Sequence, residues 1–380
     1  MAKPKVAIVG GGAAGLMTAV LLGDATIYDK NAKLGKKILV TGNGRCNLTN
    51  VNLSGDNYNN PVFMQKYLDK YGYDYQKALF EDMGMLLRVD DEGRVYPITN
   101  SARTVLDVLL SRVSAEFVCD EVLSVVSTTE GYVLTTRDGE KYYDIVVVAT
   151  GGGTRILDSL HLRRREFVAS LVPIETRERY TDLDGVRVKC VATLKRDGEV
   201  LYTERGEVLF RKYGLSGICI MNMSAYIARE GIGDSEIYLD ILPDVDEDTL
   251  VDILSKRQSS TALTALDGIL VRALAEVVLK RVGISKTDSV KTILYHSRDI
   301  AHLIKNFGFR PTGLRPISEA QVVSGGYVVD IMNEDLSVVG HPNLYIVGEA
   351  LDIDGLCGGY NLAWAWASAS VVAKSINAKI

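Results

Sequence analysis

The N-terminal part of the chain begins with an apolar run, a cluster of glycines and a second apolar run. In KVAIVGGGAAGLMTAVLL, residues 6–9 are apolar without interruption, which predicts a buried strand. The glycines predict a tight turn, and the Ala, Leu, Met and Val residues that follow predict a helix. ATIYDK then predicts a second strand, which ends at Asp29. This order of elements is typical of a Rossmann unit.

Two later segments repeat the pattern of a strand followed by glycines. In YYDIVVVATGGGT, the apolar residues 145–149 lead directly into Thr150 and three glycines. In NLYIVGEALDIDGLCGGYNLAWAWASASVVAKSI, a strand precedes Gly348 and Glu349, a glycine loop follows, and a long helix begins near Tyr360. Another strand is expected around Val122. The pattern of a strand followed by glycines therefore occurs near both ends of the chain.

The middle of the chain has two different patterns. From Leu171 onward, alternating apolar and polar residues predict hairpins, with RDGE as one of the turns. Residues 245–300 instead have the periodicity of helices, and acidic residues lie near the start of each predicted helix. The three segments are DEDTLVDILSKRQ, ALDGILVRALAEVVLKRVG and SRDIAHLIKNFG. Gly283, and Gly308 with Pro311, are expected to mark helix ends. The middle is therefore predicted to be a β-rich domain with a helical insertion.

Composition narrows the class of protein. The 380 residues carry a net charge of −5, which argues against a general electrostatic hold on nucleic acid or anionic lipid. We find no signal peptide and no uncharged apolar run of about 18 residues, the length that a membrane span requires. The five cysteines form no CxxC pair and the four histidines are scattered, so neither a disulfide framework nor a metal site is expected. A cytoplasmic protein with a small-molecule substrate is predicted.

The first glycine turn predicts a dinucleotide site. Gly10 lets the chain turn sharply out of the strand, Gly12 leaves room for a pyrophosphate, and Gly15 lets the helix pack closely on the sheet. The phosphates would lie at the helix N-terminus, where unpaired N–H groups attract anions. Asp29 lies 19 positions after Gly10, where a carboxylate binds ribose hydroxyls and favours FAD or NAD over NADP. The two later segments, at residues 142–154 and 343–376, favour FAD over NAD.

ILVTGNGRCNLTN, residues 38–50, starts like a buried strand and then breaks the pattern. Gly42 and Gly44 can bring bare backbone against the pyrophosphate and the flavin ring edge. Arg45 can face a phosphate or the O2 and N1 side of the ring with its planar donors, and the alternative is a surface salt bridge. Asn43 and Asn47 can donate hydrogen bonds to ring carbonyls. The segment is therefore predicted to approach the cofactor.

The C-terminal segment supplies a second set of candidate contacts. Glu349 follows a strand, which is the position where an acidic residue that holds the ribityl hydroxyls of FAD would lie. Gly355, Gly358 and Gly359 precede a helix whose N-terminus can stabilise negative charge on a reduced flavin, and the alternative is a glycine-rich loop that caps an unrelated helix. Cys46 and Cys357 lie in the two glycine loops. The two cysteines are either a redox pair that passes electrons to the flavin, or each is a small side chain that fills a tight space.

The motifs GKKILVTGNGRCNLTN and GEALDIDGLCGGYNLAWAWASAS resemble those of BaiN-like (YhiN-type) flavoproteins. GEVLFRKYGLSGICIMNMS and IYLDILPD also resemble the middle domain of that family, so the resemblance extends over essentially the whole chain. It implies FAD as cofactor, a cofactor domain from both chain ends, a β-rich middle domain and a small helical insertion. Aminoacetone oxidation and reduction of unsaturated steroid-type ketones are among the activities attributed to the family.

The sequence departs from the family pattern in two places. The connection at residues 155–172, which contains His161 and Arg163 to Arg165, is shortened and basic. It is either a changed substrate or partner surface or a solvated helix face, and we favour the helix face. The usual Gly-Gly-Val turn is replaced by Gly325, Gly326 and Tyr327, which can bring a tyrosine into the active site.

The combined prediction is an α/β fold with a Rossmann-like FAD-binding domain of the two-dinucleotide-binding type. The FAD-binding domain is expected at residues 1–172 and 322–380, the β-rich substrate domain at 173–243 and 302–321, and the helical insertion at 244–301. The catalytic candidates are Arg45, Tyr327 and Tyr360. The predicted cofactor contacts are Gly10, Gly12, Ala13, Ala14, Gly15, Asp29, Lys30, Lys36, Lys37, Gly42, Asn43, Gly44, Arg45, Cys46, Asn47, Val122, Ala149, Thr150, Gly151, Gly348, Glu349, Gly355, Gly358, Gly359, Tyr360, Asn361 and Leu362.

The predicted function is that of an FAD-dependent oxidoreductase. It would transfer a hydride between flavin N5 and a ketone, an enone or an amine, with NAD(P)H as a candidate donor. No second GxGxxG motif occurs, so NAD(P)H would share a pocket or bind without that motif. The alternative is a flavin-bearing binding or regulatory protein, or a tRNA-modifying flavoprotein. The acidic net charge disfavours RNA as a partner, and the sequence leaves the oligomeric state open.

Overall fold

The computed structural model describes residues 3–380 and divides them into two compact units. Unit 1 consists of residues 3–168 and 321–380, and unit 2 consists of residues 169–320. Each unit has its own hydrophobic core. Unit 1 therefore contains both ends of the described chain, and unit 2 is inserted between them.

The main sheet of unit 1 has six strands in the order β20-β21-β10-β1-β2-β6. Their bounds are β1 (Val6–Val9), β2 (Thr26–Tyr28), β6 (Glu116–Val118), β10 (Ile145–Val148), β20 (Ser337–Val338) and β21 (His341–Ile346). All neighbours pair in parallel except β20, which is antiparallel to β21. Every residue of β1 and β10 is buried, which explains why both strands are continuous apolar runs.

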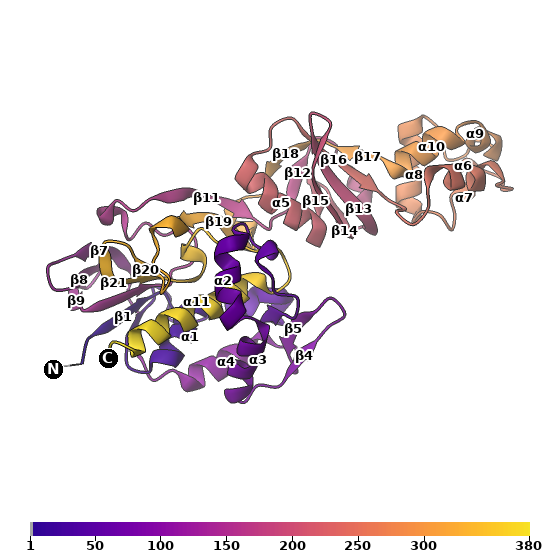
Figure 1. The fold of residues 1–380 in the computed structure, drawn as a ribbon. Coiled ribbons are helices and arrows are strands. Elements are labelled where there is room, and N and C mark those ends of the chain that lie inside the picture. The colour runs from indigo at the N-terminus through magenta and orange to yellow at the C-terminus, as the bar shows by residue number, and fades with distance from the viewer. Residues whose placement is uncertain (1–2) are drawn as a thin grey trace. The chain divides into compact units, whose positions relative to one another are not determined.

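Helices from opposite ends of the chain pack together in unit 1. Figure 1 shows α11 (Tyr360–Asn377), in yellow, beside α1 (Ala13–Leu22), in indigo. Trp364 and Trp366 of α11 are among the largest fully buried side chains of the protein. The remaining helices of the unit are α2 (Pro61–Tyr71), α3 (Tyr73–Asp82) and α4 (Ala102–Arg112). The core of unit 1 is thus completed by the last helix of the chain.

Three smaller sheets accompany the main sheet. One contains β3 (Thr49–Asn50), β5 (Arg94–Pro97) and β4 (Leu87–Val89), and another contains β7 (Val122–Ser127), β8 (Tyr132–Thr136) and β9 (Gly139–Tyr143). In the third, β11 (Arg164–Ser170) pairs with β19 (Val322–Tyr327). β19 leads into β20 and β21, so the chain returns to the main sheet through it.

Unit 2 is built on a seven-stranded sheet with the order β17-β16-β13-β14-β15-β12-β18. The bounds are β12 (Ile174–Thr176), β13 (Arg187–Arg196), β14 (Glu199–Arg211), β15 (Gly214–Ser216), β16 (Ser235–Asp240), β17 (Phe307–Phe309) and β18 (Pro311–Leu314). Asp197 and Gly198 connect β13 and β14, and both have positive φ, as a two-residue hairpin turn of type I′ requires. The hairpin that RDGE predicted is confirmed.

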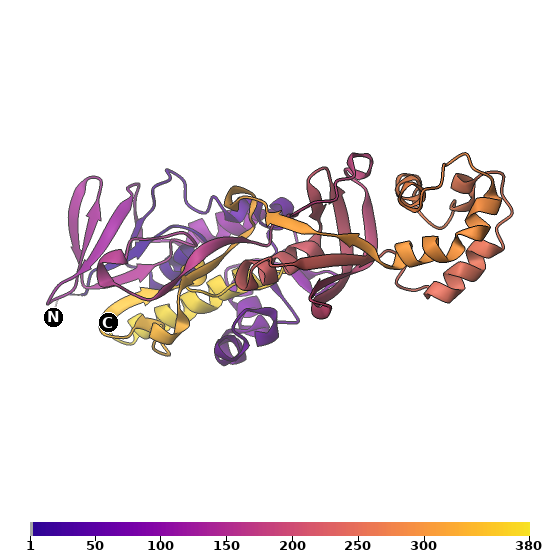
Figure 2. The ribbon, with the colours of Figure 1, turned by 90° about the horizontal axis from the view of Figure 1, so that it is seen from above.

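The helices of unit 2 are α5 (Ile218–Glu230), α6 (Glu247–Ser255), α7 (Ala262–Ala265), α8 (Arg272–Val282), α9 (Val290–Tyr295) and α10 (Ser297–Lys305). Helices α6 to α10 form one group, which the chain enters after β16 and leaves into β17 (Figure 2). Gly283 ends α8 with a left-handed conformation, as expected for a helix C-terminus. Together, these elements confirm the predicted fold class.

Three local predictions are wrong. The run that starts at Ile38 is not a strand: η1 (Ile38–Gly44) consists of 3₁₀ turns interrupted by a kink at Thr41 to Asn43, where the backbone leaves helical geometry. Arg163 to Arg165 do not lie on a helix, since β11 begins at Arg164 and pairs with β19. Gly308 lies inside β17 and not at the end of α10, which stops at Lys305.

Candidate functional site

The predicted site lies at the edge where three parallel strands of unit 1 end. Val9 of β1 is in register with Val148 of β10, and Val148 is in register with Ile346 of β21. The loops that follow these strands therefore begin side by side. β1 continues through α1 to β2 on one side, while β10 lies on its other side. Ligands of open α/β sheets bind at such a crossover point.

The glycines of the first turn are needed for two different structural reasons. Gly10 has φ +107°, and a Cβ there would lie 2.4 Å from the Ala149 carbonyl oxygen. A Cβ on Gly15 would lie 1.9 Å from the Gly10 carbonyl oxygen. A Cβ on Gly12 would meet no atom within 4 Å. Gly10 and Gly15 thus permit close packing, whereas Gly12 borders open space that can receive a ligand group.

The N-termini of α1 and α11 both lack a side-chain cap. Gly12 is the N-cap of α1 and Gly359 is the N-cap of α11, and neither helix has an acidic residue in its first turn. Their first N–H groups therefore remain available to an anion or a carbonyl oxygen. Ala13 and Ala14 begin α1 directly after the open position at Gly12. This arrangement fits a pyrophosphate.

Asp29 is held next to the first glycine turn. One carboxylate oxygen accepts a hydrogen bond of 2.9 Å from the Gly11 N–H, and the other accepts bonds from the backbone and side-chain nitrogens of Asn31. The carboxylate is partly exposed and has further lone pairs, so it can also accept bonds from ribose hydroxyls. Lys30, the next residue, lies 3.7 Å from a Glu121 carboxylate oxygen.

Glu349 connects three segments of unit 1. Its Oε1 accepts a hydrogen bond from the Val323 N–H at 2.8 Å, and its Oε2 accepts one from the Gly152 N–H at 3.3 Å. The Lys37 ammonium lies 3.6 Å from the same Oε2. Glu349 therefore fixes the turn after β10 against β19, in addition to any contact it makes with a ribityl chain.

The segment from Gly42 to Asn47 is a tight loop with unusual backbone geometry. Gly42, Asn43, Gly44 and Cys46 all have φ between 54° and 79°. Non-glycine residues in that region cost about 1 kcal/mol or more, so the loop is held by its surroundings. The Asn47 side-chain oxygen is buried and has no hydrogen-bond partner among residues 3–380. An unsatisfied acceptor at this position fits a site that a ligand completes.

Arg45 is exposed at this loop. Its Nε donates to the Gly42 carbonyl oxygen at 3.2 Å, and its guanidinium carbon lies 5.0 Å from the centre of the Tyr96 ring. The described residues include no carboxylate in an ion pair with Arg45. The surface salt bridge that was the alternative for Arg45 is thus not formed. Its planar donors remain available.

The glycine loop before α11 is held by side chains of residues 50–59, which the sequence did not single out. Asn50 Nδ2 donates to the Gly358 carbonyl oxygen at 2.9 Å, and the Tyr58 hydroxyl donates to the Tyr360 carbonyl oxygen at 2.7 Å. Asn59 donates to the Asp352 carbonyl oxygen and accepts from the Asp354 N–H, both at 3.0 Å. Amide side chains spaced along TNVNLSGDNYNN are the only signal for these bonds.

The loop itself has little room. A Cβ on Gly359 would lie 2.6 Å from the Thr49 carbonyl oxygen, and Gly359 has φ +96°. The Asn361 side chain bonds to Gly355 through both its oxygen and its nitrogen, at 2.8 Å each. The N-terminus of α11 is thus fixed by residues from both ends of the chain. Asp352 and Asp354, two buried carboxylates beside the loop, were also not among the predicted contacts.

The two tyrosine candidates lie in different surroundings. Tyr327 is 1% exposed, burial raises the pKa of its hydroxyl, and Asp158 and Arg164 are its charged neighbours. Tyr360 is the first residue of α11, and its ring lies against Gly358 in the glycine loop. Tyr360 therefore lies at the glycine loop itself, whereas the Tyr327 carbonyl oxygen accepts a hydrogen bond of 2.8 Å from the Asp352 N–H beside that loop. Both side chains are part of the core of unit 1.

The other predicted cofactor contacts lie in several elements of unit 1. Lys36 is exposed, Val122 is buried at the start of β7, and Leu362 lies in the first turn of α11. Val122 thus belongs to a separate sheet and not to the strands whose ends form the site. Ala149, Thr150 and Gly151 directly follow β10 at that edge.

None of the five cysteines is in a disulfide bond, and Cys46 is fully buried. Burial raises the pKa of the Cys46 thiol from 9.0 to about 11, so the reactive thiolate is scarce near neutral pH. This environment favours the interpretation of Cys46 as a small residue in a tight spot.

We predict that iodoacetamide at pH 8 alkylates the exposed Cys119 and leaves Cys46 of the folded protein unmodified. The reason is that Cys46 is both shielded and protonated. Because its folded-state pKa is raised, the buried neutral thiol contributes stability below pH 9 that is lost as the pH rises from 9 to about 11. Peptide mass spectrometry measures both sites, and a Cys119→Ser variant is the control. Rapid labelling of Cys46 at pH 8 would contradict the prediction.

Residues 3–380 contain neither a candidate metal site nor a candidate membrane-spanning helix. No cluster of three or more His, Cys, Asp or Glu side chains in that range could hold a metal ion. Within the same residues, none of the helices combines the length and apolarity needed to cross a lipid bilayer.

Taken together, the residues at this edge fit FAD. They provide open space at Gly12, two uncapped helix N-termini, the fixed carboxylates of Asp29 and Glu349, and the unsatisfied oxygen of Asn47. These groups suit a pyrophosphate, ribose and ribityl hydroxyls, and a ring with hydrogen-bonding edges.

This chain is similar to several known proteins. The chain is 27% identical to a 3-dehydro-bile acid delta(4,6)-reductase of Clostridium scindens, over 96% of this chain and 97% of the relative. It is 28% identical to a ribosomal RNA dihydrouridine synthase of Escherichia coli, over 97% of each chain. Among solved structures, the open conformation of a flavocytochrome c3 fumarate reductase matches 98% of this chain and 78% of its own, with 14% identity and a TM-score of 0.44.

The family assignment rests on two matches that together span most of the chain. Residues 4–160 match the HI0933-like protein Rossmann domain. Residues 168–322 match the HI0933-like protein barrel and H2TH domain. The chain belongs to the HI0933-like family of FAD-dependent oxidoreductases.

Proposed function

We propose that this oxidoreductase reduces a carbon–carbon double bond conjugated to a carbonyl group, by hydride transfer from flavin N5, with NAD(P)H as the electron donor. The observation that carries the proposal is the chemistry shared by the two relatives. A 3-dehydro-delta(4,6) bile acid has double bonds conjugated to its 3-oxo group. Formation of dihydrouridine saturates the uridine double bond that is conjugated to a ring carbonyl. Both relatives align with nearly the full chain.

The cofactor contacts assigned above supply the first part of the mechanism. We assign the pyrophosphate to Gly12 and the N-terminus of α1, the adenosine ribose to Asp29, and the ribityl side to Glu349. When bound, FAD supplies a hydride carrier at N5. The N-terminus of α11, which Asn50, Tyr58 and Asn59 hold in place, would contribute partial positive charge to a bound flavin ring.

The protein must also stabilise the charge that develops on the substrate and supply it with a proton. It receives a hydride at the carbon β to its carbonyl, so negative charge develops on the carbonyl oxygen and a proton must reach the α carbon. We assign Arg45 to the carbonyl oxygen, since its donors are exposed and no carboxylate among the described residues neutralises it. Tyr360 is the candidate proton donor because it lies at the glycine loop before α11.

Anaerobic spectroscopy tests this function. NADH or NADPH should remove the oxidised-flavin absorbance, and a 3-oxo-4,6-diene steroid or a simple cyclic enone should restore it, with one equivalent of product in which one double bond is saturated. Reduction by neither donor, or reoxidation by oxygen but by no conjugated carbonyl, would refute the proposal. The same experiment separates an enzyme from a flavin-bearing binding or regulatory protein, because the latter would show no turnover.

We predict that Arg45→Ala lowers kcat/KM for an enone by about 10- to 100-fold, or roughly 1–3 kcal/mol, because the charge on the carbonyl oxygen loses its donor. Arg88→Ala is the matched control. The Arg88 guanidinium carbon also lies near the Tyr96 ring, at 4.9 Å, but Arg88 is held by Asn100 and is not assigned a role. Stopped-flow reoxidation of the reduced enzyme by the enone measures the step. Equal rates for wild type and Arg45→Ala would remove Arg45 from the site.

A second candidate is reduction of uridine in RNA. It is favoured by the relative named as a ribosomal RNA dihydrouridine synthase, which aligns over 97% of this chain. The bond reduced is of the same type, so the two candidates differ in what holds the substrate and not in the chemistry at the flavin.

A further inference from the structure

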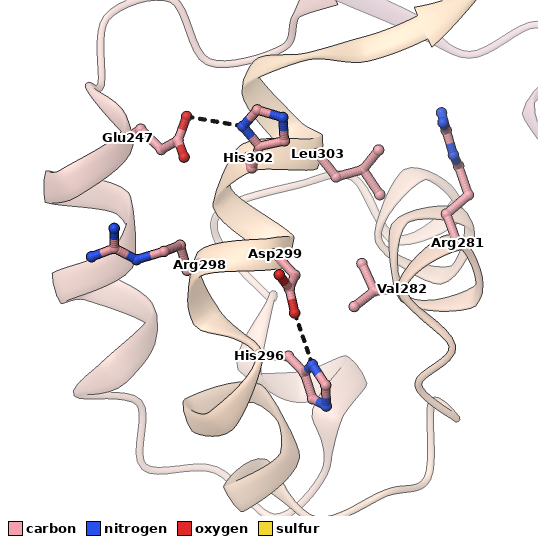
Figure 3. Close-up of a pocket in the computed structure, with 8 residues that line it drawn as sticks. All are labelled: Glu247, Arg281, Val282, His296, Arg298, Asp299, His302 and Leu303. Atoms are coloured by element: carbon pink, nitrogen blue, oxygen red, sulfur yellow. Dashed lines mark hydrogen bonds and ion pairs between the residues drawn. The ribbon is translucent and has the colours of Figure 1, made fainter.

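The helical group of unit 2 contains a surface cavity of about 600 Å³ that the flavin chemistry does not use. Figure 3 shows its lining from α6, α8 and α10, with Glu247 and Arg281 on opposite sides of α10. Its two acidic residues each face a histidine. A Glu247 carboxylate oxygen lies 3.5 Å from Nδ1 of His302, and an Asp299 oxygen lies 3.0 Å from Nδ1 of His296.

The arginines of this cavity are not neutralised. Arg281 and Arg298 are exposed, and the described residues provide neither of them with an ion-pair partner. The Arg281 guanidinium carbon also lies 4.8 Å from the centre of the Phe307 ring, which holds the guanidinium group beside β17. Two exposed guanidinium groups, without carboxylate partners, are suited to bidentate contacts with phosphate.

A second cavity, of about 370 Å³, shares Arg281 with the first. It is lined by Arg179, Lys280 and Arg281 as cations and by Asp182 as its one acid, and Tyr180 and Thr181 add hydroxyl groups. The two cavities together therefore present four basic side chains, namely Arg179, Lys280, Arg281 and Arg298. A ligand with several phosphates could contact both cavities, whereas one free phosphate could not.

An exposed aromatic ring lies next to this cationic surface. Tyr295, at the end of α9, is 86% exposed, and its ring centre lies 5.1 Å from that of His296, which lines the larger cavity. A ring beside phosphate-binding cations is the arrangement on which unpaired bases stack.

We propose that these two cavities and Tyr295 form a docking surface for single-stranded or looped RNA, with the cations on the phosphodiester backbone and the tyrosine under a base. This inference rests on the proposed function and names the substrate class for the reduction of uridine. The net charge of −5 disfavours a general electrostatic hold on RNA, but individual phosphate contacts depend on the local cluster of cations.

Binding of a fluorescein-labelled, uridine-rich RNA hairpin, followed by anisotropy at several salt concentrations, tests the surface. The double variant Arg281→Ala, Arg298→Ala should bind at least 10-fold more weakly and lower the slope of log Kd against log salt by about 2. Tyr295→Ala should weaken binding about 5-fold or more with an unchanged slope, because stacking involves no counterion. All three side chains are exposed, so the fold should be retained.

The matched control removes two cations of the same helical group that are already paired. Lys256 lies 2.6 Å from Asp252, and Arg272 lies 3.9 Å from Glu276. Lys256→Ala, Arg272→Ala should bind RNA like wild type. Equal losses in the two double variants, or no RNA binding by wild type, would overturn the proposal. Displacement of the RNA by uridine monophosphate at similar affinity would do so too, because the surface would then be a mononucleotide site.

Failure of this inference can be distinguished from failure of the proposed function. The reduction of a small enone needs no RNA, so the Arg281→Ala, Arg298→Ala variant should reduce it at the wild-type rate. Loss of RNA binding with normal enone reduction supports the docking surface. Enone reduction without any RNA binding by the wild type refutes the docking surface alone.

Discussion

The Gly12→Val variant is expected to fold normally and to purify without FAD. Gly12 has φ −82° and ψ −161°, an extended conformation that valine adopts without strain, and a Cβ there would meet no protein atom within 4 Å. The added side chain would instead fill the space at the N-terminus of α1 that we assign to the pyrophosphate. We expect affinity for FAD to fall by more than about 100-fold, or roughly 3 kcal/mol.

The flavin-to-protein absorbance ratio and a fluorescence titration with FAD measure this effect. Circular dichroism and the melting temperature of the apoprotein report whether the fold is kept. Gly313→Val is the matched control, because a Cβ at Gly313 in β18 also meets no atom within 4 Å but lies in unit 2. A yellow Gly12→Val protein with normal affinity would mean that the open space beside Gly12 is not part of the cofactor site.

The Gly359→Ala variant is expected to lose both stability and FAD affinity. Gly359 has φ +96°, where a Cβ costs about 1–2 kcal/mol, and that Cβ would lie 2.6 Å from the Thr49 carbonyl oxygen and 2.7 Å from the Asn47 side-chain oxygen. Either the N-terminus of α11 or the segment at Asn47 must shift. Since both belong to the proposed cofactor site, we expect a destabilisation of about 3 kcal/mol and FAD binding weakened about 10-fold or more.

Gly283→Ala separates strain from crowding. Gly283 has φ +84° at the end of α8, but a Cβ there would meet nothing within 4 Å. This control should cost only about 1 kcal/mol and leave the flavin unchanged. Thermal unfolding and FAD titration of the two variants give the comparison. If both variants lose the same stability and retain FAD equally, the contact between Gly359 and Thr49 has no role in the cofactor site.

The parts of the fold that the sequence predicted are those encoded locally. Strand β1, the turn at Gly10 and helix α1 follow one another within about 17 residues, so one window contains both the pattern and its explanation. The same holds for β10 with its glycines, for the hairpin at Asp197 and Gly198, and for the start of α11 at Tyr360.

The errors arise where distant residues decide the structure. Arg164 begins a strand because β19, more than 150 residues away, offers a partner, and no periodicity in a short basic segment contains that information. The bonds from Asn50, Tyr58 and Asn59 to the C-terminal loop join residues about 300 positions apart. The apolar start of ILVTGNG suggested a strand, but its glycines and Asn43 adopt left-handed geometry, which ends extended structure at once.

The insertion of unit 2 between β10 and β21 sets an order of events during synthesis. The ribosome produces β1, β2 and β10 first, then all of residues 169–320, and only afterwards the strand that pairs with β10 and the helix that packs on α1. Unit 2 can therefore fold on the nascent chain while the sheet of unit 1 still has an open edge at β10. The proposed cofactor site is therefore completed last, and we expect a chain that is truncated before residue 341 to lose its affinity for FAD.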